Sequence, residues 1–60
     1  MKLTHVQDFH SHKRFNFKSF GIVSYMDIHP CTREVLYSTH KPGTEPYIKQ
    51  QKAIENYFKV

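Results

Sequence analysis

Residues 15–28, which read FNFKSFGIVSYMDI, are rich in strand-forming side chains. Aromatic and β-branched residues dominate this stretch, as is typical of β-strands. The two-residue alternation slips midway, because Phe15 and Phe17 share one parity whereas Phe20 and Ile22 share the other. Gly21 lies at the slip, and a glycine inside a strand often marks a bulge. We therefore predict one long strand with a bulge at Gly21, which returns both sets of side chains to one face.

The segments on either side of this stretch complete a predicted sheet. Residues 2–9 alternate loosely and predict a weak or edge strand, and residues 34–39, EVLYST, predict another. Residues 27–32, DIHPCT, have turn chemistry, because proline fixes φ while aspartate and threonine can bond nearby backbone amides. The long strand and residues 34–39 are therefore expected to form an antiparallel hairpin.

The C-terminal segment has the period of a helix. Thr44 or Glu45 can cap it, and the first turn of a helix tolerates Pro46. From Tyr47 onward, steps of 100° per residue place one set of side chains in a narrow stripe: Tyr47, Gln51, Ile54 and Phe58. A helix of this length is marginal alone, so the stripe must pack on the sheet.

These elements predict an α+β fold in the order β-β-β-α. A small three-stranded antiparallel sheet carries one C-terminal helix packed on one face, and residues 1–60 form a single small basic domain. A single helix covers only one side of a sheet, so the other side is left to water or a partner. A binding function is therefore expected on the side of the sheet that the helix leaves uncovered.

Length and charge limit the classes of function. The chain has 60 residues, with 9 Lys and Arg against 5 Asp and Glu, a net charge of +4. Such a chain buries only about 60% of its unfolded surface, and it is too short for Rossmann or TIM-barrel domains. Aromatic residues, 15% of the chain, compensate for a lean aliphatic core. The excess of positive charge favours an anionic partner such as nucleic acid.

Cations and aromatic rings alternate in residues 13–20, KRFNFKSF. Single-stranded nucleic acid is bound in this way, because Lys and Arg neutralise phosphates while rings stack on bases. With the basic residues expected to border the sheet, the predicted binding residues are Lys13, Arg14, Phe15, Phe17, Lys18, Arg33 and Lys41. The alternative is that Phe15 and Phe17 are core residues packed under the helix.

Histidine and cysteine offer a second constellation. The pairs His10 and His12, and His29 and Cys31, could each supply two zinc ligands, and a structural zinc would stabilise a thin core. Neither pair has the spacing of a zinc knuckle. A straight strand over residues 14–28 would also hold the pairs about 45 Å apart. We therefore predict no metal site and no cofactor.

Catalytic signals are weak. The five acidic residues are scattered singly, and the chain lacks a glycine-rich phosphate loop and a nucleophile elbow. Cys31 lies two residues from His29, but a nucleophile also needs an oriented base, an oxyanion site and a pocket. We predict that the protein is not an enzyme.

Two binding functions follow. The first is a small regulatory protein that binds nucleic acid or a nucleoprotein complex through a basic, aromatic sheet face. The alternative is a stoichiometric inhibitor or modulator of a host enzyme, a format common among small viral proteins, which would use the open face or an edge strand. A homodimer is also compatible with such a face. The single Cys31 and the lack of an apolar span predict a cytoplasmic protein without a membrane partner.

Overall fold

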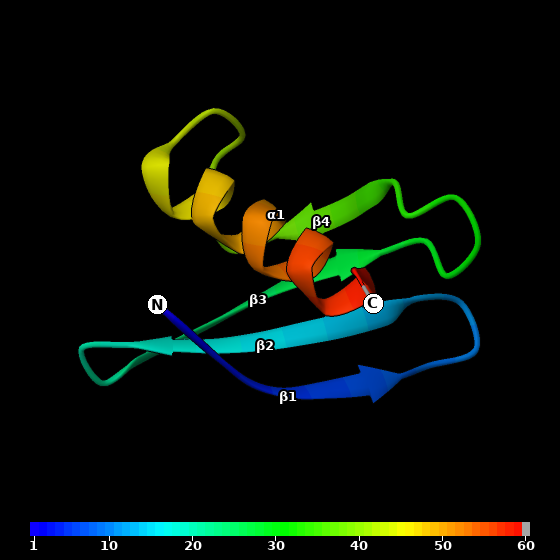
Figure 1. The fold of residues 1–60 in the computed structure, drawn as a ribbon, viewed down its shortest axis with the longest axis horizontal. Coiled ribbons are helices and arrows are strands. Elements are labelled where there is room, and N and C mark those ends of the chain that lie inside the picture. The colour runs from blue at the N-terminus through cyan, green and yellow to red at the C-terminus, as the bar shows by residue number, and fades with distance from the viewer. Residues whose placement is uncertain (60) are drawn as a thin grey trace.

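The protein folds as a four-stranded antiparallel sheet with one helix across one face (Figure 1). This computed structural model describes residues 1–59. The elements follow in chain order: β1 (Lys2–Asp8), β2 (Lys13–Ser19), β3 (Ile22–Ile28), β4 (Val35–Ser38) and α1 (Glu45–Phe58). The predicted α+β class and C-terminal helix are confirmed. The predicted number of strands is wrong, because the sheet has four strands and not three.

The fourth strand arises because the predicted long strand folds back at Phe20 and Gly21. Both residues have positive φ, 51° and 79°, and Ser19 pairs directly with Ile22. Positive φ at both central residues is the pattern of the two-residue type I′ hairpin, whose twist matches that of its strands. The slip in parity therefore marks a turn, and the predicted bulge at Gly21 is wrong.

The core lies between the sheet and α1. Phe15 and Phe17 of β2 have no exposed surface, and Met26 and Ile28 of β3 pack beside them under Ile54 of the helix. Full burial of one such side chain stabilises the fold by about 1.5–3 kcal/mol. The pairing of β2 with β3 explains the arrangement, because a two-residue turn brings odd-numbered residues of β2 opposite even-numbered residues of β3.

The helix begins after Thr44, with Pro46 in its first turn. Ile54 of the predicted stripe is buried, and the other three members are half-buried. The stripe omitted Gln50, which is fully buried. The Gln50 amide donates to the Ser24 hydroxyl oxygen (Nε2 to Oγ, 3.3 Å) and accepts from the Ser38 hydroxyl (Oγ to Oε1, 2.8 Å). One polar side chain thus joins α1 to β3 and β4.

Both edge strands carry an irregularity. The register of β1 against β2 shifts between Leu3 and His5, and that of β4 against β3 shifts beside Leu36. Bulges twist the edge of a sheet and hinder the addition of another strand. The geometry therefore disfavours partner binding by strand addition. Within residues 1–59, no helix has the length and apolar character that crossing a membrane requires.

Candidate functional site

The sheet face opposite α1, called the open face below, carries the candidate site. Among residues 1–59, no helix covers this face (Figure 1). Its side chains alternate with the core residues along each strand. By this register the open face comprises Lys2, His5, Gln7, Arg14, Asn16, Lys18, Val23, Tyr25, Asp27 and Tyr37.

An ion pair lies on this face between β2 and β3. Arg14 and Asp27 are register partners, and Arg14 donates two hydrogen bonds to the carboxylate, from Nε to Oδ1 at 2.8 Å and from Nη2 to Oδ2 at 3.0 Å. The side chain of Asp27 is only 9% exposed. These hydrogen bonds raise the pKa of Arg14 further above its ordinary value. The guanidinium is therefore already paired with a protein carboxylate.

Aromatic rings surround this ion pair. The guanidinium carbon of Arg14 lies 4.1 Å from the ring centroid of Tyr25 and 5.5 Å from that of Phe9. Tyr25 and Tyr37, on neighbouring strands, have centroids 5.6 Å apart. Tyr37 is 54% exposed, whereas Tyr25 is half-buried. We call Tyr25 and Tyr37 the aromatic platform, because they present adjacent rings on the open face.

Two lysines of the open face lie directly opposite each other. Lys2 of β1 is the register partner of Lys18 of β2, and both are exposed. Among residues 1–59, neither forms an ion pair. Like charges directly opposite in a sheet are destabilising. This lysine pair is therefore a place where a bound anion would relieve repulsion.

The structure divides the predicted binding residues between two faces. Arg14 and Lys18 lie on the open face. Lys13 lies on the helix side, where its ammonium contacts Asp8 at 3.4 Å and sits 5.4 Å from the Phe58 ring centroid. The guanidinium of Arg33 also covers that ring, at 4.0 Å. Lys41 lies in the connection between β4 and α1. The predicted set therefore does not form one site.

The aromatic members of the predicted set are in the core. Phe15 and Phe17 are covered by α1 and are not accessible for stacking on a base, so their placement matches the core alternative. Among the strand residues of the open face, the rings are those of the aromatic platform, Tyr25 and Tyr37, which sequence reasoning missed. The signal was present in the parity. A two-residue turn at Phe20 places Tyr25 on the face opposite Phe15 and Phe17.

Three of the five histidines, His10, His12 and His29, lie with Cys31 in two loops at one end of the sheet. The β1–β2 and β3–β4 loops lie at the same end of the sheet (Figure 1). The separation of about 45 Å that a straight strand would impose on the two pairs is therefore wrong. No three His, Cys, Asp or Glu side chains of residues 1–59 are close enough together to hold a metal. The His29 ring accepts hydrogen bonds at Nδ1 from the backbone amides of Cys31 and Thr32, both at 3.1 Å. His29 thus stabilises its own turn.

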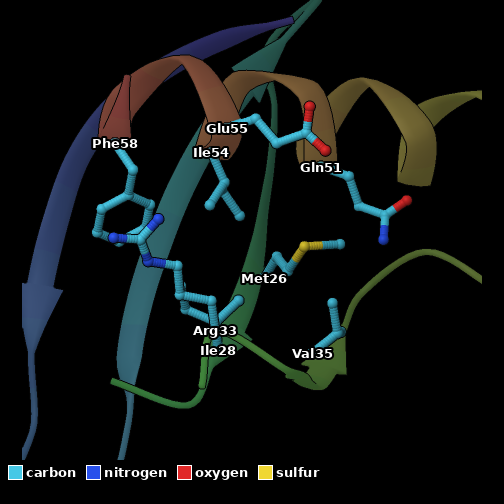
Figure 2. A pocket seen from close by; sticks show the side chains of 8 residues that line it. All are labelled: Met26, Ile28, Arg33, Val35, Gln51, Ile54, Glu55 and Phe58. Atoms are coloured by element: carbon cyan, nitrogen blue, oxygen red, sulfur yellow. The ribbon is translucent and has the colours of Figure 1, made fainter. Parts of the chain in front are cut away.

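A cleft of about 230 Å³ lies between α1 and the β3–β4 hairpin (Figure 2). Met26, Ile28 and Val35 line its sheet side, and Ile54 and Phe58 line its helix side. Arg33 also lines the cleft, and its guanidinium lies over the ring of Phe58. Its positive charge interacts favourably with the C-terminal end of α1, whose last turn has no basic residue. The cleft is smaller than the roughly 300–1,000 Å³ of most ligand sites. It is best described as the margin of the core.

Comparison with protein-family models, with curated proteins and with solved structures found no match. Function is therefore inferred from the open face of this chain.

Proposed function

We propose that the protein binds single-stranded nucleic acid, free or within a nucleoprotein complex, through the open face of its sheet. The observation that carries the proposal is the lysine pair, Lys2 and Lys18, on the same face as the exposed ring of Tyr37. Lysines attract phosphates, and base stacking on an aromatic side chain contributes about 1–3 kcal/mol per base. The two features together suit an anionic chain whose bases are accessible.

A single strand fits this surface better than a duplex. Bases in a duplex are stacked on one another, so their faces cannot reach Tyr37. Duplex binders also concentrate more Lys and Arg on one surface than the two unpaired lysines of the open face. The net charge of +4 is in keeping with a modest, salt-sensitive affinity.

Arg14 has a different role in this proposal from the one that its charge suggests. Its hydrogen bonds to Asp27 and its contact with Tyr25 make it a positioning residue for the aromatic platform. The phosphate contacts are assigned to Lys2 and Lys18 instead. Substitution of Arg14 should therefore act through the orientation of Tyr25, with little effect on the salt dependence of binding.

The test is a fluorescence anisotropy titration of a labelled single-stranded oligonucleotide at several salt concentrations. Replacing both Lys2 and Lys18 by Ala should make the slope of log K against log salt shallower by about 1.4, since each phosphate contact on a single strand contributes about 0.7. The matched control replaces Lys52 and Lys59, two exposed lysines in and just after α1, by Ala. Equal slopes for the two double variants would contradict the proposal.

A stoichiometric protein regulator is the second candidate. The exposed apolar side chains at the β2–β3 turn favour it, because Phe20 is fully exposed and Ile22 and Val23 are each 69% exposed. This function predicts no oligonucleotide binding, together with capture of one protein at equal stoichiometry from nuclease-treated lysate. Replacing Phe20 by Ala would then abolish that capture.

A further inference from the structure

The turn between β2 and β3 presents a free aromatic ring. The side chain of Phe20 has a relative exposure of 101%, so it makes no packing contact that shields it. The turn projects beyond the rest of the sheet (Figure 1), and a Cβ placed on Gly21 would meet no atom within 4 Å. The ring of Phe20 is therefore accessible on both of its faces.

Folding does not explain a phenylalanine at this position. Its φ of 51° lies in the left-handed region, which bulky residues avoid and which Asn and Gly usually fill in type I′ turns. The ring gains no burial in exchange for this conformation. Contact with a partner explains a bulky side chain that strains its turn without becoming buried.

The surroundings of the turn identify the chemistry of that partner. Lys18, a member of the lysine pair, lies two residues before Phe20 in the chain, and its register partner on β3 is Val23. Tyr25 follows two residues later on the same face of β3. The nearby carboxylate of Glu45 is already paired with Lys49 at 3.3 Å. Free positive charge thus adjoins the ring.

We infer that Phe20 stacks on an unpaired base of the strand that crosses the open face. This inference rests on the proposed function and extends its site from the aromatic platform to the tip of the turn. Tyr25 lies three residues along β3 from Ile22, the first strand residue after the turn, which is about 10 Å. The lysine pair lies at the same end of the sheet as Phe20 and holds phosphates next to the stacked base. The flanking charge of the lysine pair favours a base, which is attached to phosphates, over an apolar protein groove.

The chain contains no tryptophan, so Phe20→Trp introduces a single fluorescent reporter at the tip. Titration with a single-stranded oligonucleotide of about eight bases, a length within the site sizes of known single-strand binders, should quench its emission. The quenching curve should follow the anisotropy curve of the labelled oligonucleotide. Ile48→Trp, on an exposed position of α1, is the control and should bind with little quenching.

These titrations distinguish base stacking at Phe20 from oligonucleotide binding by the protein as a whole. Anisotropy binding without quenching at Phe20→Trp would overturn the inference and leave the proposed function standing. Absence of any oligonucleotide binding would overturn both. Vesicles of anionic phospholipid are titrated in parallel, and a blue shift with them but not with the oligonucleotide would assign the tip to lipid and overturn the inference.

A second set of variants distinguishes stacking from simple apolar contact. Phe20→Ala should weaken oligonucleotide binding by about 5-fold to 150-fold, which corresponds to the usual range for loss of one stacked base. Phe20→Leu keeps an apolar side chain without a π face and should lose nearly as much, whereas Phe20→Tyr should bind as the wild type does. Full affinity for Phe20→Leu would show that stacking is not involved. Circular dichroism checks that each variant is folded.

Discussion

Arg14 and Asp27 face each other across β2 and β3 and are joined by two hydrogen bonds of 2.8 and 3.0 Å on the open face of the sheet. Such fork-shaped pairs are geometrically specific as well as strong. The same guanidinium lies 4.1 Å from the centroid of Tyr25. The pair therefore neutralises the acidic residue of the open face and orients a ring of the aromatic platform.

Loss of this pair should destabilise the protein, because Asp27 would keep a nearly buried charge without its main partner. We expect the urea midpoint to fall in the order wild type, Arg14→Lys, Arg14→Gln, since lysine retains the charge but not the fork. Equilibrium unfolding monitored by tyrosine fluorescence measures this order. If Arg14→Lys equalled the wild type, charge alone would account for the pair.

The pair should also contribute equally at neutral and mildly alkaline pH. Hydrogen bonding to Asp27 raises the pKa of Arg14, so its stabilisation is fully present below the unfolded pKa and is lost only as pH rises through the higher folded value. Both values lie far above neutrality. The difference in unfolding free energy between wild type and Arg14→Gln should therefore stay constant from about pH 7 to pH 9. A steep decline across that interval would argue against the guanidinium as its source.

Gln50 is expected to be a major polar contact in the core. Gln50→Met keeps the volume but removes both hydrogen bonds, which leaves the nearly buried Ser24 hydroxyl without this donor. The expected loss of unfolding free energy is about 1–3 kcal/mol. Gln51→Met, at the next and only half-buried position, is the control and should change stability by less than about 0.5 kcal/mol. Similar urea midpoints for the two variants would refute the role of Gln50.

Phe20→Asn should stabilise the folded protein. Asn tolerates the left-handed conformation and would create the Asn-Gly pair preferred in type I′ turns, with an expected gain of about 1 kcal/mol. For so small a domain this corresponds to a rise in Tm of about 4–8 °C. Phe20→Ala removes the same ring without relieving the backbone and should show no such rise. A lower Tm for Phe20→Asn would mean that the ring stabilises the fold.

The lysine pair should likewise oppose stability. Lys18→Glu places a carboxylate opposite Lys2 and should raise the unfolding free energy by about 0.2–1 kcal/mol, because opposite charges in register attract. The same change should abolish oligonucleotide binding. Lys52→Glu on α1 makes the same change of net charge and should preserve binding. Retained affinity in Lys18→Glu would remove this lysine from the site.

The sequence pattern was enough to predict elements whose residue signals lie close together in the chain. Thr44 and Pro46 indicated the start of the helix, and the apolar spacing up to Phe58 indicated its length. Propensity was misleading at Phe20, because phenylalanine is common in strands and unusual in a type I′ turn. That one residue changed the number of strands, because the chain reverses at Phe20 and Gly21 instead of continuing through a bulge.

By itself, the sequence determined the α+β class, the C-terminal helix and the excess of positive charge, since composition and short-range periodicity suffice for these. Only the tertiary structure decided which rings are accessible and which cations are free. Phe15 and Lys18 belong to the same strand, yet one is in the core and the other on the open face. Alternation along β2 puts the two side chains on opposite faces, and the packing of α1 decided which of those faces became the core.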